Sequence, residues 1–172
     1  MQMDKGLDTG DMLAKVKLTI KPEDTSSSLH DKLSILGATA LANLLPAVEK
    51  QQLQATPQTE SDVTYAHKLS KQEALVDWNK PAIDVLRAIQ GYNPWPVAHT
   101  TLNGAALRIW AATSNNTCPA GTAGQIKTEK NRLFVACADN HIEITELQAA
   151  NKRRMTASEY LAAHKIDTLT LG

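Results

Sequence analysis

The feature that most restricts the fold is the two-residue period that begins after residue 97. Asn103-Gly104 separates two alternating segments, AHTTL and AALRIW, and favours a tight hairpin turn because both residues tolerate positive φ. Three further short strands are predicted over residues 124–127, 132–138 and 141–147. A long loop over residues 113–121 connects the two sets. Five short strands with one or two small helices are typical of a closed antiparallel barrel such as the OB-fold.

Two short helices are predicted beside these strands. Residues 81–91 have an apolar face, Pro81 in the first turn and Gly91 at the C-terminal end, as expected for an amphipathic helix. Thr156 and Glu159 have the spacing of a capping box, which predicts a helix over SEYLAAHK. The last residues, 168–172, are expected to be a frayed end.

A polar stretch divides the chain. The residues from Glu49 to Asp62 include Pro57 and almost no large apolar side chains, so they cannot bury enough surface to hold a core. We therefore expect an extended linker over residues 51–63. It separates an N-terminal part, residues 1–50, from a C-terminal domain, residues 64–172.

The N-terminal part is predicted to contain a strand and a long helix. Residues 12–20 alternate lysines with apolar residues, which indicates a half-buried strand. Asp24 or Thr25 is placed to cap the helix that follows. Gly37 indicates either a close helix contact or a break between two helices, with a backbone surface for a ligand as the functional alternative. One buried stripe is expected along this helix, formed by Leu29, Leu33, Leu36, Ala40, Leu44 and Val48.

Composition limits the classes of function. Lys+Arg and Asp+Glu number 18 each, so RNA affinity requires a local cationic patch. Aromatic residues make up 4%, which argues against an array of base-stacking platforms. Cys118 and Cys137 are too few for a disulfide framework and are expected to be reduced thiols. With no signal peptide and no long apolar run, a cytoplasmic protein is expected.

The first twelve residues resemble the end of a strand followed by a loop rich in Gly and Asp. Gly6 and Gly10 permit positive φ and a close backbone approach, and Asp4, Asp8 and Asp11 place three carboxylates near them. Asp8 can be a catalytic carboxylate or can cap its own turn. A calcium site does not fit, because the second ligand position is a glycine and no Glu follows at the twelfth position. The five histidines are scattered without metal spacing, so no metal is expected.

Several segments in order resemble the methionyl-tRNA formyltransferase family: MQMDKGLDTGDML, EDTSSSLHDKL, VTYAHKLSKQEALVDW and YNPWP. The resemblance implies transfer of a formyl group from 10-formyltetrahydrofolate to methionyl-initiator tRNA. It also implies an α+β chain: the remnant of a doubly wound α/β formyltransferase domain, then a small antiparallel OB-like β-barrel that binds the tRNA acceptor arm.

The resemblance assigns catalysis to Asp8 and a folate-binding loop to Gly6, Leu7, Asp8, Thr9 and Gly10. The family's catalytic Asn and His lie upstream of this loop and have no counterpart among these residues. The N-terminal half of the catalytic domain is therefore the missing partner. We expect no measurable formyl transfer by this chain alone.

Six cations are candidate tRNA contacts: Lys68, Lys71, Arg108, Lys152, Arg153 and Arg154. Lys68 and Lys71 share a face if they lie in a turn of helix, and the alternative is a solvated lysine face. Residues 152–154 precede a helix N-terminus, where cations are unfavourable, so a phosphate is expected as the missing counterion. The alternative is a solvated turn. Trp95 is expected to cover the core rather than to stack on a base.

Two other functions are compatible with these residues. One is a formyltransferase or formyl-folate hydrolase that acts on a non-tRNA substrate. The other is an RNA-binding module without catalysis.

Overall fold

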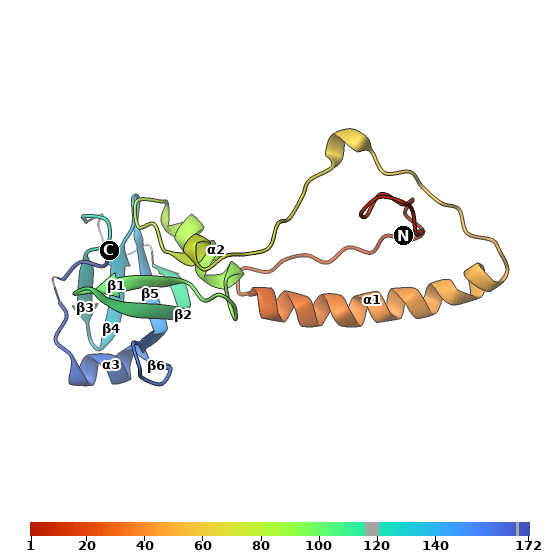
Figure 1. Cartoon of the computed structure of the whole chain (residues 1–172). Coiled ribbons are helices and arrows are strands. Elements are labelled where there is room, and N and C mark those ends of the chain that lie inside the picture. Colours follow the sequence, from red (N-terminus) through yellow and green to blue (C-terminus); the bar gives the residue numbers. More distant parts are fainter. Residues whose placement is uncertain (116–120, 168) are drawn as a thin grey trace. The chain divides into compact units, whose positions relative to one another are not determined.

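The computed structural model describes residues 1–115, 121–167 and 169–172 (Figure 1). The chain divides into two compact units. The first comprises residues 1–24 and 28–68, and the second comprises residues 25–27 and 69–172. Cys118 lies outside the described residues, whereas Cys137 is buried.

The second unit is built on one antiparallel sheet, with the order β1-β2-β5-β4-β3 and β6 paired to β5. The strands are β1 His99–Leu102, β2 Ala105–Asn115, β3 Ile126–Glu129, β4 Arg132–Ala136, β5 His141–Ala149 and β6 Met155–Thr156. Five of the six were predicted from the two-residue period, and the short β6 was not. The predicted start of the loop at residue 113 is wrong, because β2 continues to Asn115 beside β5. Asn103 and Gly104 have φ values of 51° and 77°, which confirms the predicted tight turn.

The C-terminal segment joins the two edges of this sheet. Leu171 pairs with Leu102 of β1, and Thr170 pairs with Gln125 immediately before β3. Three backbone hydrogen bonds accompany these bridges: Gly172 N to Thr101 O at 3.2 Å, Leu171 N to Gly124 O at 2.9 Å, and Ile126 N to Leu169 O at 2.7 Å. The prediction of a frayed end is therefore wrong for residues 169–172. The open edges of β1 and β3 need hydrogen-bond partners, and this segment supplies them.

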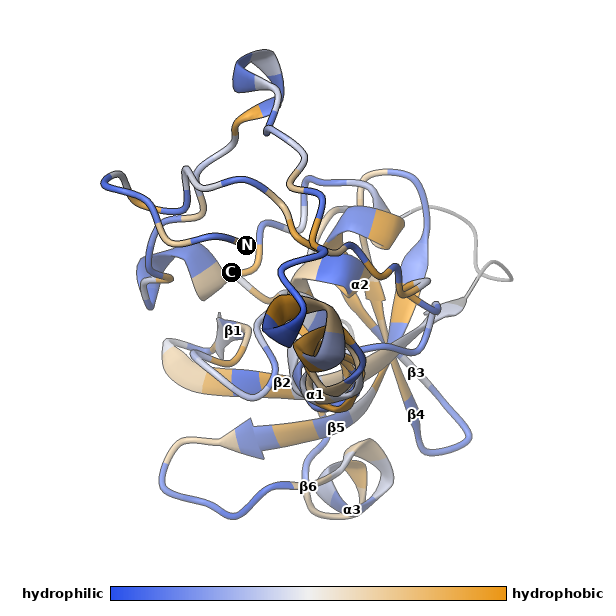
Figure 2. Cartoon of the chain, turned by 90° about the vertical axis from the view of Figure 1, so that its right-hand side faces the viewer, coloured by the Kyte–Doolittle hydropathy of each residue, from blue (hydrophilic) through white to orange (hydrophobic). Residues whose placement is uncertain are grey.

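Two helices cover different sides of the sheet (Figures 1 and 2). Helix α2, Ala82–Gly91, packs mainly on β2 and buries Val85 and Ile89, as its apolar face predicted. Helix α3, Ala157–Ala163, packs on β4 and β5 and begins with the predicted capping box of Thr156 and Glu159. A short 3₁₀ helix, η2 Gln72–Ala74, precedes α2.

Strand interiors and helix faces meet in one apolar core. Its fully buried members include Ile109 of β2, Val135 of β4 and Leu147 of β5. Trp78 is buried beside them, and its Nε1 donates to Thr100 Oγ1 at 3.2 Å. The indole polar group is thus satisfied inside the core, as burial of a polar group requires. Leu171 is only 2% exposed, so the closing segment contributes to the core as well as to the sheet.

The first unit contains a 3₁₀ turn, η1 Glu60–Asp62, and most of helix α1, Ser26–Glu49. The helix is continuous through Gly37, and a Cβ there would meet nothing within 4 Å, so neither the predicted break nor the predicted close helix contact is found in the described residues. The alternative of a backbone surface for a ligand stays a prediction. None of its residues is buried, and Ile35 is 71% exposed. The predicted stripe is therefore helical but not buried, and two of its members, Leu33 and Val48, are 53% and 44% exposed. Apolar residues on α1 are visible in Figure 2.

The strand predicted over residues 12–20 is not formed. Only Met12 makes an isolated bridge, to Thr56, with hydrogen bonds of 2.8 and 2.9 Å. A strand needs a neighbouring strand to pair its backbone groups, and among the described residues none pairs with residues 13–20.

Barrel closure predicts different effects for two alanine substitutions. Gly104 and Gly124 both have positive φ, so alanine at either position has a cost of about 1–2 kcal/mol. A Cβ at Gly104 meets nothing within 4 Å, whereas a Cβ at Gly124 lies 2.4 Å from Leu171 O. We expect Gly124→Ala to lower the free energy of unfolding by about 1–3 kcal/mol more than Gly104→Ala. Urea denaturation measures both values, and equal losses contradict closure by the C-terminal segment.

Candidate functional site

The loop that carries Asp8 is closed on itself through its backbone. Gln2 N donates to Asp11 O at 2.8 Å. Asp8 has a φ of 54°, and a Cβ at Gly10 would lie 1.8 Å from Gln2 O. Glycine is therefore required at residue 10, as the predicted close approach implies. The loop exposes Leu7 and Asp8 to solvent.

Residues from the predicted linker hold this loop. Gln58 Nε2 donates to Asp8 O at 2.8 Å and to Gly10 O at 2.7 Å. Thr9 Oγ1 donates to Asp4 Oδ2 at 3.1 Å. The Asp8 carboxylate itself makes no hydrogen bond to the residues that the structure describes, so it does not cap its own turn there. The backbone positions Asp8 while its carboxylate stays available.

Most of the cationic turn at residues 152–154 is neutralised within the chain. Arg153 donates to Glu159 Oε1 at 2.7 Å, across the first turn of α3. Arg154 Nε donates to Glu146 Oε2 at 2.6 Å, and its guanidinium lies 4.8 Å from the centre of the Trp110 ring. The predicted phosphate is therefore not a missing counterion for the two arginines, because Glu159 and Glu146 fill that role.

The carboxylate of Glu159 has two sets of donors. The Arg153 hydrogen bond is the largest cause that lowers the pKa of Glu159 from 4.5 to about 2, and hydrogen bonds from Thr156 add to it. The same carboxylate accepts from Thr156 N at 2.9 Å in the capping box. One side chain thus stabilises the start of α3 and orients an arginine.

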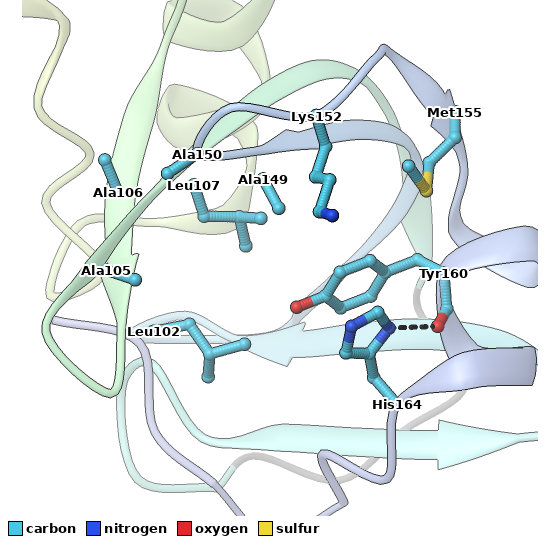
Figure 3. Close-up of a pocket in the computed structure, with 10 residues that line it drawn as sticks. All are labelled: Leu102, Ala105, Ala106, Leu107, Ala149, Ala150, Lys152, Met155, Tyr160 and His164. Atoms are coloured by element: carbon cyan, nitrogen blue, oxygen red, sulfur yellow. Dashed lines mark hydrogen bonds between the residues drawn. The ribbon is translucent and has the colours of Figure 1, made fainter.

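Lys152 differs from its two neighbours. Within residues 1–115, 121–167 and 169–172, its ammonium has no hydrogen-bond or ion-pair partner. It lies at the edge of a groove of about 190 Å³. Lys152 was predicted from the sequence but the groove was not, because its walls come from segments far apart in the chain. Figure 3 shows the lining residues: Leu102, Ala105, Ala106, Leu107, Ala149, Ala150, Lys152, Met155, Tyr160 and His164.

The remaining predicted contacts have different environments. Arg108 is exposed on β2 opposite Gln148 of β5, and Gln148 Oε1 accepts from Trp110 Nε1 at 3.1 Å. Cross-strand partners project from the same face, so Arg108 lies on the face that carries Trp110 and Arg154. Lys68 and Lys71 are exposed, but residues 63–70 contain no helix, so the predicted shared helical face is not formed.

Trp95 was predicted to cover the core, and this prediction is wrong. The side chain is 56% exposed in the turn after α2. The turn is held through a neighbouring residue, because Asn93 Nδ2 donates to Trp110 O at 2.8 Å. The turn is thus attached to β2 while the indole of Trp95 faces solvent.

Neither a metal centre nor a membrane-spanning helix is present in the part of the chain that the structure describes. No group of three His, Cys, Asp or Glu side chains there is arranged to hold a metal ion. No helix there combines the length and apolar character needed to cross a membrane.

The closed sheet with α2 and α3 places residues 69–172 among small antiparallel β-barrel domains. The chain belongs to the family described as formyl transferase, C-terminal domain, which matches residues 68–165. The resemblance noted in the sequence is thereby confirmed at the level of the family.

Three relatives extend the match to the N-terminal part. The methionyl-tRNA formyltransferase of Methylococcus capsulatus is 43% identical over 172 residues, all of this chain and 56% of the relative. That of Hydrogenovibrio crunogenus is 42% identical over all of this chain and 55% of the relative. That of Stutzerimonas stutzeri is 47% identical over 86% of this chain and 47% of the relative. The chain therefore spans about half the length of these relatives.

Solved structures share the fold at low identity. HypX from Aquifex aeolicus in complex with tetrahydrofolic acid has a TM-score of 0.68 at 16% identity, over 97% of this chain and 32% of that chain. The N-formyltransferase from Helicobacter canadensis, in complex with folinic acid and dTDP-3-aminofucose, has a TM-score of 0.59 at 13% identity. That match covers 89% of this chain and 53% of the other. Both likenesses concern the fold alone.

The Arg153–Glu159 pair predicts a low pKa that can be measured. We expect the side-chain carboxyl carbon of Glu159 to titrate with a pKa of about 2 and Arg153→Ala to move this pKa toward 4.5. Because the folded-state pKa is depressed, the stabilisation by this group is complete above about pH 4.5 and is lost as the pH falls toward 2. A carbon-13 NMR titration measures the pKa.

Lys152→Ala is the matched control, because the Lys152 ammonium does not contact Glu159. It is expected to leave the titration unchanged. A Glu159 pKa of 4.5 in the unsubstituted chain means that the ion pair is absent in solution.

Proposed function

We propose that the chain is the C-terminal half of an enzyme that transfers a formyl group from 10-formyltetrahydrofolate to the amino group of methionyl-initiator tRNA, in the cytoplasm. The observation that carries this proposal is the 42–43% identity to two methionyl-tRNA formyltransferases over the whole of this chain. That similarity includes the Asp8 loop, the linker and the barrel. It therefore extends beyond the barrel to which the family match is limited.

Asp8 is the catalytic residue in this proposal. In formyl transfer the attacking amine loses a proton while the folate nitrogen gains one, so a carboxylate that orients a histidine can assist both steps. The family places that histidine and an asparagine upstream. The structure supports a role for Asp8 in that its carboxylate is exposed on a loop tied by Gln2, Gly10 and Gln58. Gly6, Leu7, Thr9 and Gly10 complete the proposed folate-binding loop.

The barrel binds the acceptor arm of the tRNA in this proposal. The overall charge is balanced, so attraction for phosphates comes from a local group of cations. Arg108 and Arg154 lie on one face of β2 and β5, and Lys152 follows β5 with its ammonium unpaired among the described residues. Arg153 extends this group, with a side chain that is 70% exposed. Lys68, the last residue of the first unit, and Lys71, near the start of the second, are further exposed candidate contacts.

A non-tRNA formyl acceptor is the second candidate. The solved structure from Helicobacter canadensis contains an amino sugar nucleotide, but it shares only 13% identity with this chain. The methionyl-tRNA formyltransferases are about three times as similar at the level of sequence. The tRNA substrate is therefore favoured. Formylation by a chimera that restores the upstream part distinguishes an enzymatic role from a purely RNA-binding role.

Phosphate contacts predict a salt-dependent change in RNA affinity. We expect replacement of Lys152, Arg153 and Arg154 by alanine to weaken binding of initiator tRNA and of other tRNAs by similar factors. The slope of log K against log salt should become shallower by about 1 for each phosphate that the variant no longer binds. Gel-shift titrations at several salt concentrations measure both quantities.

Lys80→Ala is the control, because Lys80 is exposed near the turn between β4 and β5, at the far end of β5 from residues 152–154. It should change the affinity little. Unchanged affinity and slope in the triple variant would rule out this cationic turn as the RNA contact.

The family's catalytic Asn and His have no counterpart among these residues. We therefore predict that the 172-residue chain alone gives no measurable formylation. A chimera with the upstream part of the Methylococcus capsulatus relative should be active. In it, Asp8→Asn should lower kcat by about 10²–10⁴-fold, because a positioned proton-transfer group is removed. Transfer of labelled formyl groups to methionyl-tRNA is the measurement.

Asp11→Asn is the matched control, because it removes a carboxylate from the same loop. We expect it to keep most of the activity of the chimera. Turnover by the isolated chain, or equal activity of the two variants, contradicts the role of Asp8.

A further inference from the structure

A groove at one end of the barrel is not accounted for by the phosphate contacts. Leu102 comes from the end of β1, Leu107 from the start of β2, Ala149 from the end of β5 and Met155 from β6 (Figure 3). Small alanine side chains beside them leave the floor shallow and apolar. Its volume of about 190 Å³ is below the ~300–1,000 Å³ of ordinary small-molecule pockets, so it suits a single ring system.

Three polar groups stand around this apolar floor. They are the Lys152 ammonium, the Tyr160 hydroxyl and the His164 imidazole (Figure 3). Neither the ammonium nor the hydroxyl has a partner among the described residues. The adjacent Arg153 and Arg154 are both paired with glutamates. The groove therefore offers one cation that binds an anion without first separating from a carboxylate.

An aromatic pair forms one wall. The rings of Tyr160 and His164 stack with centroids 4.2 Å apart and an interplanar angle of 11°. Tyr160 is 6% exposed, whereas His164 is exposed, so His164 is the outer ring. His164 Nδ1 donates to Tyr160 O at 2.9 Å, which sets the ring orientation and leaves Nε2 as an acceptor in the neutral ring.

We propose that this groove binds one unpaired nucleotide of an RNA, with the base against the His164 ring and the apolar floor and a phosphate on Lys152. The proposal rests on the proposed RNA-binding role of the barrel and names a subsite for it. Unpaired bases are recognised by stacking on aromatic side chains, including His, and by hydrogen bonds to their edges. A flat base matches the stacked wall, and its phosphate matches the unpaired ammonium. An apolar side chain from a protein partner would leave Lys152 without a counterion.

NMR on the full chain tests the site directly, with a single-stranded RNA tetranucleotide as the probe. We expect its addition to shift the Met155 methyl and His164 ring signals. A blunt RNA duplex of the same composition should bind more weakly there, because its bases are already paired and stacked. Shifts on both signals that are equal for the duplex and the single strand would overturn the proposal.

Substitutions distinguish the contribution of stacking on His164 from that of the Lys152 charge to RNA affinity. His164→Ala should weaken binding of the tetranucleotide by about 5- to 100-fold, the range for loss of one base–aromatic stack. His164→Phe retains a flat ring on Tyr160 and should restore most of the affinity. Lys152→Gln should weaken binding and reduce its salt dependence, whereas Lys80→Gln should do neither. Amide spectra of each variant confirm that the barrel is folded.

The outcomes distinguish this proposal from the broader RNA-binding role. If the chain binds initiator tRNA but His164→Ala binds RNA as well as the unsubstituted chain, the groove is not the nucleotide site and the broader role stands. If the chain binds no RNA at all, both fail. If the groove signals shift with protein concentration and not with RNA, a second copy of the chain occupies the groove and the proposal is wrong.

Discussion

The hydrogen bonds between the last four residues and the two edge strands determine the architecture of the C-terminal unit. Without them the outer edges of β1 and β3 would have unpaired backbone groups, which could pair with another chain. With them the sheet closes around a core that includes Leu171 itself. Leu102, which pairs with Leu171 in this closure, also lines the groove at the ends of β1 and β5. The floor of the groove follows from the register that places Leu107 of β2 opposite Ala149 of β5.

The three cations beside this groove differ in how readily each can bind a phosphate. Arg153 and Arg154 are held by Glu159 and Glu146, so a phosphate that binds either guanidinium competes with a carboxylate. The glutamates lower the net attraction but fix the direction of each guanidinium in advance. Lys152 has no such competitor among the described residues. We infer that the arginines contribute orientation and that Lys152 contributes most of the available charge.

The fold of the C-terminal unit was largely predictable because its signals are local. The alternating strands, the turn at Asn103-Gly104 and the capping box of Thr156 and Glu159 each depend on neighbours within a few residues. The closing role of residues 169–172 depends on two distant strands. The sequence of such a short segment does not indicate whether its backbone is paired with them.

Only part of the candidate site was predicted from the sequence. The role of Asp8 was inferred from the family resemblance and that of residues 152–154 from their charge beside a capping box, and both roles stay predictions. Glu146, which pairs with Arg154, was missed because the register between β5 and β6 brings the two side chains together. The Tyr160–His164 stack was also missed, although the two residues are only four apart in the sequence, a spacing that places them on one face of a helix. Trp95 was predicted to be buried from its residue type, and the stripe on α1 from the helical spacing of its apolar residues. Burial also needs a covering surface, which neither residue type nor spacing specifies, and Trp95 and the α1 residues are not buried.

We infer that closure by the C-terminal segment makes the barrel the cooperative folding unit of this chain, whereas α1 has no buried residue. Amide hydrogen exchange measures this directly. We expect the amides of Leu171 and Ile126 to exchange as slowly as those of the central strands β2 and β5, and amides within α1 to exchange orders of magnitude faster. Exchange at Leu171 and Ile126 as fast as in α1 would contradict the claim.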